Sequence, residues 1–219
     1  VMGNIKFDIE ADENTIANGR AERAALFGDR PVWIAASTHE GEEKIVLDVH
    51  EALRARHDDL LLVLVPRHPE RFAAVRELVE RRGHRVVKRT DGRPAGEAAV
   101  FLCDTMGEVP LFYAASDVAF VAGSLVPIGG HNLLEPASLG VPFVTGPHNF
   151  NAQDIADMFL ERGACRQVAD ANELVETVSE LLTNPDEAAR LGRAGQEVLE
   201  ENRGALERLL VLLEPLLAS

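Results

Sequence analysis

The feature that most constrains the fold of this chain is a regular alternation of short apolar runs with helical patterns. Seven apolar runs of strand length occur, at residues 31–37, 60–66, 84–89, 98–104, 117–124, 142–146 and 165–168. Most lack a polar position at every second residue, so neither face of these strands is suited to water. Such runs are typical of a parallel sheet that is covered on both faces.

Helical patterns separate these runs. They cover residues 42–56, 69–83, 107–116 and the chain from about residue 170 to its end. Strands that alternate with helices predict a doubly wound, Rossmann-like α/β fold. A leucine stripe within residues 205–217 predicts a last helix. That helix either packs on this domain or crosses to another one.

Composition excludes several classes of protein. The formal net charge of −14 argues against general nucleic-acid binding. Cys103 and Cys165 are too few and too far apart for a disulfide framework or a zinc site. No apolar run approaches the roughly 20 residues of a membrane span, and we expect a soluble chain. Val1 precedes Met2, so we expect the chain to begin within a longer parent.

Ligands of doubly wound folds bind at the carboxyl ends of the strands, near a topological switch point. Four polar loops follow predicted strands there: "STHEGEE", "PRHPE", "CDTMGE" and "GSLVPIGGHNLLEP". Neither Walker A nor the G-x-G-x-x-G fingerprint occurs. The sequence therefore predicts a ligand site of another kind at this edge.

The loop "GGHNLLEP" combines glycines with polar side chains at a helix start. Gly129 and Gly130 permit positive φ and close approach of a ligand. Free N–H groups at the helix start suit a phosphate, and Glu135 can accept hydrogen bonds from ribose hydroxyls. The alternative is a capping box, with Asn132 as N-cap and Glu135 at N3, which leaves the glycines and His131 unexplained.

In "PRHPE", Arg67 is a permanently charged fork suited to a phosphate. Pro66 stiffens its approach and His68 can orient it. The alternative is a solvated arginine, followed by Pro69 at the first position of a helix.

In "CDTMGE", the backbone from Met106 to Glu108 can read the edge of a base. The interpretation that the residues favour is a helix cap by Asp104 or Thr105, with Glu108 in the first turn.

In "STHEGEE", Ser37 or Thr38 is a candidate N-cap of the next helix. His39 and Glu40, with the acidic residues that follow, lack the H-E-x-x-H spacing of a zinc site. Acidic residues at a helix start usually interact with its dipole. We therefore expect no metal, and a metal hydrolase is a distant alternative.

Taken together, the motifs resemble the carboxy-terminal half of the Kdo transferases of lipopolysaccharide synthesis. In order along the chain they are "GNIKFD", "ASTHEGEE", "PRHPERF", "DTMGE", "GSLVPIGGHNLLEPA" and "GPHNFN". Those enzymes move ketodeoxyoctulosonic acid (Kdo) from CMP-Kdo to a lipid A precursor. The chain departs from the family at Pro127-Ile128, where a charged pair is usual, and at Leu133, where proline is usual.

The resemblance implies the donor half of a two-domain glycosyltransferase of the GT-B type. Residues 1–219 would be the CMP-Kdo-binding domain, with residues 1–10 as the linker between domains. The acceptor domain, the general base and the membrane contact would lie in a missing amino-terminal half. This chain alone would then be inactive, while the full enzyme works at the cytoplasmic face of the bacterial inner membrane.

The resemblance also implies a set of site residues without a metal or cofactor. Lys6, in "GNIKFD", would stabilise the transition state. The residues that bind CMP would be Pro66, Arg67, Met106, Gly107, Glu108, Asn132, Leu133, Leu134 and Glu135. Those that support them would be Ser37, Thr38, His39, His68, Asp104, Thr105, Gly123, Ser124, Gly129, Gly130 and His131.

Two alternatives stay open on the sequence. One is another nucleotide-sugar enzyme of the same architecture, such as a hexosaminyl transferase or an epimerase. The other is a non-catalytic nucleotide-binding module.

Overall fold

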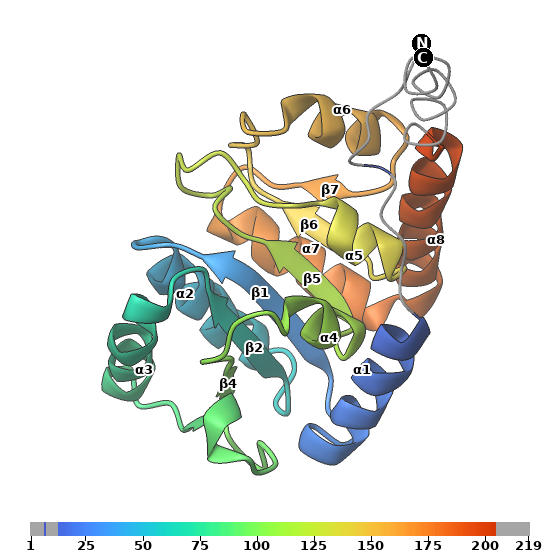
Figure 1. Ribbon diagram of the computed structural model, residues 1–219. Helices are drawn as coiled ribbons and strands as arrows, with labels where there is room; N and C mark the ends of the chain where they lie inside the picture. The colour runs from blue at the N-terminus through green and yellow to red at the C-terminus, as the bar shows by residue number, and fades with distance from the viewer. Residues whose placement is uncertain (1–6, 8–12, 205–219) are drawn as a thin grey trace, which may run out of the picture.

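A computed structural model describes Phe7 and residues 13–204 of the chain (Figure 1). Seven strands form within these residues. They are β1 (Val32–Thr38), β2 (Leu61–Pro66), β3 (Val86–Lys88), β4 (Val100–Leu102), β5 (Val118–Val121), β6 (Phe143–Thr145) and β7 (Arg166–Gln167).

Helices connect and flank the strands. The α-helices are α1 (Glu13–Leu26), α2 (Glu42–Arg54), α3 (Phe72–Arg81), α4 (Val109–Ala114), α5 (Leu134–Ser138), α6 (Gln153–Glu161), α7 (Ala171–Thr183) and α8 (Pro185–Asn202). Short 3₁₀ helices lie at η2 (Pro69–Arg71) and η3 (Arg89–Asp91). None of the helices described has both the length and the apolar character needed to cross a bilayer.

The strands form one parallel sheet in the order β3-β4-β2-β1-β5-β6-β7. The chain builds outward from β1 through β2 to the β4 and β3 edge. It then returns to the other side of β1 and builds outward through β5, β6 and β7. The topological switch point therefore lies between β1 and β5, where loops diverge and leave space for a ligand.

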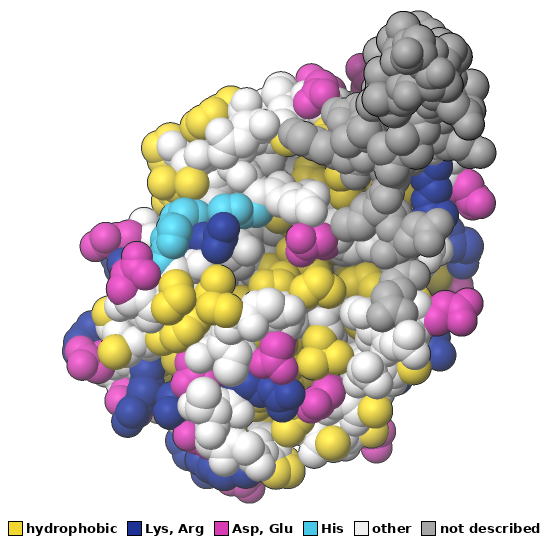
Figure 2. Space-filling model, in the orientation of Figure 1, with side chains coloured by type: hydrophobic (Ala, Val, Ile, Leu, Met, Phe, Trp, Pro, Cys, Tyr) yellow, Lys and Arg dark blue, Asp and Glu magenta, His cyan; other side chains and the backbone are white. Residues whose placement is uncertain are grey.

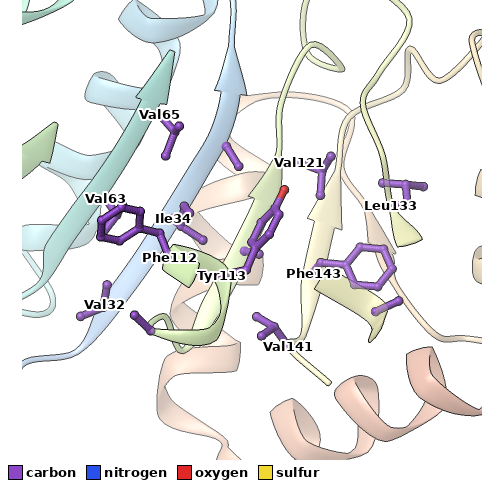
Figure 3. Packing of buried hydrophobic residues seen from close by; sticks show 14 of the residues in the cluster. Val32, Ile34, Val63, Val65, Phe112, Tyr113, Val121, Leu133, Val141 and Phe143 are labelled. Atoms are coloured by element: carbon purple, nitrogen blue, oxygen red, sulfur yellow. The ribbon is translucent and has the colours of Figure 1, made fainter. Parts of the chain in front are cut away.

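Helices cover both faces of the sheet (Figure 1). One apolar cluster joins Val32, Ile34 and Ala36 of β1 to residues of α4, α5, α6 and α8, and Figure 3 shows part of it. The other cluster joins Trp33 and Ala35 to α2, α3 and α7. Because alternate residues of β1 enter different apolar layers, the strand is apolar throughout, as the sequence predicts.

The predicted fold class and all seven strands are confirmed, but two features differ. The predicted helix from about residue 170 is broken at Asn184, whose side chain accepts a hydrogen bond from the N–H of Glu187 and caps α8. Helix α1 was not predicted, because its sequence consists largely of alanine and charged residues. Its Gly19 packs closely on Ala114 of α4. The predicted linker (1–10, except Phe7) and the leucine stripe in 205–217 lie outside the described residues.

Candidate functional site

A cavity of about 400 Å³ opens at the carboxyl ends of the strands, where the sequence predicts a ligand site. Its lining comes from the ends of β1 and β2, from α4 with the loop before it, and from α5 with the loop before it. The lining residues are Ser37, Val65, Pro66, Arg67, Thr105, Met106, Gly107, Val109, Pro110, Tyr113, His131, Asn132 and Glu135. Nine of them are predicted site residues, brought together from segments about 100 residues apart in the sequence.

Arg67 carries the free positive charge of this cavity. It follows β2, and its backbone N–H donates to Thr38 O at 3.0 Å, which ties the end of β2 to that of β1. Its guanidinium is exposed and forms no salt bridge with any residue from 13 to 204. By contrast, Arg71 pairs with Glu43 and Arg89 pairs with Glu108. An exposed, unpaired guanidinium suits an anionic ligand.

Glu42 holds the loop that follows β5. Its carboxylate is fully buried and accepts hydrogen bonds from the N–H groups of Gly123, Ser124 and Leu125, and more weakly from that of His39. Glu42 lies in the first turn of α2, where an acidic residue suits the helix dipole as the sequence predicts, but its carboxylate also binds these backbone N–H groups. The loop lies beyond the sheet, so its backbone N–H groups have no neighbouring strand to pair with, and the carboxylate of Glu42 accepts their hydrogen bonds instead. No local sequence pattern marks such a role.

Glu43 is also a structural residue. Its buried carboxylate accepts two hydrogen bonds from Arg71 at 3.1 Å each, and Arg71 also pairs with the exposed Glu40. These contacts account for the acidic residues of "STHEGEE". Across residues 13–204, no three His, Cys, Asp or Glu side chains form a group that could hold a metal.

Ser37 and Thr38 are not N-caps, as the sequence had suggested. Both lie within β1, and α2 begins after Gly41, which makes no side-chain cap. The strand is irregular here, because its register with β2 shifts between Ala36 and Thr38, and Ser37 adopts a φ of 64°. Such left-handed backbone is costly for a non-glycine residue. The irregularity places Ser37 in the lining of the cavity.

Three histidines gather beside Arg67, and Figure 2 shows histidine and basic side chains close together on this face. The Nε2 atoms of His39 and His131 are 2.8 Å apart, and the two rings are nearly parallel, at 3°. His68 lies edge-on to His39, with ring centroids 5.3 Å apart. Burial, with help from the neighbouring positive groups, lowers the pKa of His131 to about 4 and also lowers that of His39.

The capping box, which the sequence left as an alternative interpretation of "GGHNLLEP", does not form. Helix α5 begins at Leu134, with Leu133 at the N-cap position. Asn132 lies one residue earlier: its Oδ1 accepts from the N–H of Leu134, and its Nδ2 donates to Glu135, each at 3.1 Å. Burial raises the pKa of Glu135, although Asn132 and Arg67 oppose this effect. Leu133 and Leu134 are buried and do not line the cavity.

The two glycines of this loop have the positive φ that the sequence predicts, 108° at Gly129 and 76° at Gly130. Their surroundings are different from those expected. A Cβ built on Gly129 would lie 2.6 Å from Phe150, and one on Gly130 would lie 2.6 Å from Asn149. The close neighbour is therefore the segment "GPHNFN" of this chain.

The side chains of "CDTMGE" do not cap α4, so that interpretation is wrong. Asp104 accepts from the N–H and the hydroxyl of Thr90, while the Thr105 hydroxyl donates to Glu108. Glu108 is also bound by Arg89, which lowers the pKa of its carboxyl. The carboxylate oxygens of Glu108 are therefore already hydrogen-bonded within the chain and are poorly placed to bind a ligand. Met106, by contrast, is 56 % exposed and lines the cavity.

Two further predicted residues lie behind the lining. Gly123 supports the ring of His131, and Ser124 links the loop after β5 to Gly146 through a hydrogen bond from the Gly146 N–H. Lys6 lies outside the described residues. The sequence did not identify Tyr113 and Val109 in the lining, because their apolar pattern matches that of a core helix. The ligand roles of all these residues stay predictions.

Comparison with known proteins adds evidence that is independent of this geometry. Residues 29–198 match the family of glycosyl transferases group 1. The chain is 46 % identical, over 219 residues, to a 3-deoxy-D-manno-octulosonic acid transferase of Haemophilus influenzae, covering 99 % of this chain and 51 % of that protein. It is 35 % identical to the transferase of the same name from Bordetella pertussis, covering 98 % of this chain and 51 % of that protein.

A solved structure gives the same result. The crystal structure of the C-terminal CMP-Kdo binding domain of WaaA from Acinetobacter baumannii superposes with a TM-score of 0.81 at 36 % identity. The match covers 86 % of this chain and 99 % of that domain. The chain spans about half the length of the two transferases above.

Proposed function

Because this chain belongs to the group 1 glycosyl transferases, and within them to the Kdo transferases, we propose that it is the half that binds the donor CMP-Kdo. All of residues 1–219 would form this domain, with residues 1–10 as a linker. The full enzyme would transfer Kdo to a lipid A precursor at the cytoplasmic face of the inner membrane.

One observation carries the proposal. The guanidinium of Arg67, which has no salt bridge within the described part of the chain, and the carboxylate of Glu135 line the same cavity, at the carboxyl edge of the sheet and beside the switch point. A volume of about 400 Å³ falls within the range of small-ligand sites, roughly 300–1,000 Å³. A cation and an acceptor in one such cavity match a nucleotide, whose phosphate needs the first and whose ribose hydroxyls need the second.

Breaking the bond between the sugar and the phosphate leaves positive character on the sugar and negative charge on CMP. Arg67 would stabilise that charge as it develops. Glu135 would exchange its hydrogen bond from Asn132 for those from the ribose. The exposed Met106 would pack on the cytosine. Backbone groups of Gly107 would contact the edge of the base.

Two catalytic roles, those of the general base and of the transition-state stabiliser, would belong to groups outside this cavity. The attacking sugar hydroxyl needs a general base, which we place in the acceptor half of the enzyme. Lys6 would stabilise the transition state once the two halves face each other. We therefore expect this chain to bind CMP weakly and to transfer no sugar by itself.

Calorimetric titration of the chain with CMP tests the proposal. Arg67→Ala should weaken CMP binding about 10- to 150-fold, the loss of one charge-assisted contact of roughly 1.5–3 kcal/mol. Arg193→Ala, which removes an exposed arginine from α8, is the matched control and should change nothing. The assignment fails if the folded chain binds no CMP at millimolar concentration, or if Arg67→Ala binds it normally.

The relatives favour Kdo transfer over the rival assignments. Titration with UDP separates them experimentally. Preference for UDP over CMP would point to another nucleotide-sugar transferase or an epimerase. Equal binding of both would point to a nucleotide-binding module that does not select its base.

A further inference from the structure

We propose that the paired imidazoles of His39 and His131 form the subsite for the carboxylate of the donor sugar, and that the pair takes up one proton when the donor binds. This inference rests on the proposed function, since it concerns the sugar half of the same ligand. It gives a role to His131, which neither the phosphate nor the ribose requires.

The charges of the ligand and of the site must balance. A donor made of CMP and an acidic sugar carries two negative charges, one on the phosphate and one on the carboxylate. Arg67 supplies one positive charge. The neighbouring guanidiniums are already paired, Arg71 with Glu40 and Glu43 and Arg89 with acidic residues of its own. Among residues 13–204, Arg67 is the only arginine or lysine that lines the cavity, so the second anion needs a new positive charge, which the histidines beside Arg67 can acquire.

The geometry of the histidine pair lets it hold one additional proton. At 2.8 Å between the Nε2 atoms of His39 and His131, a single hydrogen lies between the two rings. When neutral, one ring donates this hydrogen and the other accepts it. The accepting ring carries its proton on Nδ1, and so the donating ring can gain a proton on its own Nδ1. The pair can thus hold one positive charge and keep its hydrogen bond, whereas a second proton would place two hydrogens face to face.

The backbone around the histidine pair holds it in place beside Arg67, the candidate phosphate ligand. His131 lines the cavity together with Arg67. A Cβ built on Gly123 would lie 2.8 Å from the ring of His131, so the ring rests on this backbone. Glu42 binds the N–H groups of both Gly123 and His39, which fixes the support under each ring.

The surroundings set the protonation of the free site. Burial lowers the pKa of both rings, to about 4 for His131, and the positive groups of Arg67 and His68 add to this effect. Arg71 lowers the pKa of His39 further. Three carboxylates are near, but each is engaged: Glu42 with backbone N–H groups, Glu40 with Arg71 and Glu135 with Asn132. At neutral pH the empty pair is therefore uncharged. A bound carboxylate adds the opposite charge and raises the pKa of the pair.

The test is calorimetry of this chain with CMP and with CMP-Kdo, in buffers that differ in ionisation enthalpy. We expect uptake of up to one proton with CMP-Kdo and little with CMP. The affinity for CMP-Kdo should rise as pH falls from 8 to 6, by at most about tenfold per unit. His39→Asn and His131→Asn should each abolish the uptake and weaken CMP-Kdo binding about tenfold, while CMP binding stays within about twofold.

His57→Asn is the matched control, because His57 lies in the loop before β2, at the opposite end of the sheet, where it contacts Ser179. Absence of CMP binding would refute the proposed function itself. Normal CMP binding with no proton uptake for CMP-Kdo would overturn the histidine subsite alone. The number of protons that the wild-type chain takes up with CMP-Kdo tests the histidine subsite even if one histidine variant does not fold.

Discussion

Replacing Glu42 by glutamine tests how the structure holds its ligand loops. Its Oε2 accepts from Gly123 N at 2.7 Å and from His39 N at 3.4 Å. Its Oε1 accepts from Ser124 N and Leu125 N, each at 3.1 Å. A carboxylate can accept on both oxygens, but an amide can accept on only one. Glu42→Gln therefore places an NH₂ group against two backbone N–H groups in a fully buried site.

The expected loss of stability follows from those two donors. Each buried donor left without an acceptor costs about 1–3 kcal/mol, so Glu42→Gln should lower the free energy of unfolding by about 2–6 kcal/mol. A domain of this kind has about 5–15 kcal/mol in total. The variant should therefore be only marginally stable at 37 °C but remain folded at low temperature. Its affinity for CMP should fall as well, because the loop after β5 leads to Glu135, which would hold the ribose.

Urea unfolding followed by the fluorescence of Trp33 provides the assay, since this tryptophan is single in the chain and buried. Glu197→Gln on α8 makes the same chemical change at an exposed position and should stay within about 0.5 kcal/mol of the wild type. If Glu42→Gln is equally close to the wild type, the carboxylate does not hold the loop and the reasoning is refuted.

Three further perturbations follow from the same coordinates. Gly192→Ala should lower the free energy of unfolding by about 1–3 kcal/mol in urea, because its Cβ would lie 2.1 Å from Gly140 O. Gly123→Ala should weaken CMP-Kdo binding in calorimetry, because its Cβ would lie 2.8 Å from the ring of His131. Burial lowers the pKa of His50 to about 3, below its unfolded value near 6.5. The unfolded state therefore binds the extra proton, and stability should fall as pH drops through that window, by at most about 1.4 kcal/mol per unit.

Each of these predictions has its own control. Gly195→Ala lies one turn from Gly192 in α8 but has 3.4 Å to its nearest neighbour, so it should be nearly neutral. Gly28→Ala has a similar positive φ to Gly123 but nothing within 4 Å, which isolates the backbone strain. His50→Leu should remove part of the acid-dependent loss. Equal effects in a variant and its control, or an unchanged pH profile in His50→Leu, would contradict the corresponding prediction.

The sequence alone identified the parallel sheet because the apolar pattern of each strand is local. The run "LLLVLVP" has no polar face, and β2 is buried at every position. The same reasoning missed α1, whose packing depends on the close approach of Gly19 to Ala114 across a gap of 95 positions. Small-residue contacts leave almost no hydrophobic period in the sequence, so only the tertiary arrangement reveals them.

The sequence by itself also determined which loops carry the polar chemistry, since each follows a buried strand, and parallel strands end at one edge. It could not decide what each side chain does there. Glu42 and Glu108 are acidic residues near helix starts, as the sequence suggests, but their partners come from the loop after β5 and from Arg89. Partners that lie tens of residues away in the chain are fixed only by the order of the strands. The tertiary structure therefore decided which groups stay free for a ligand, and Arg67 beside the histidine pair is the result.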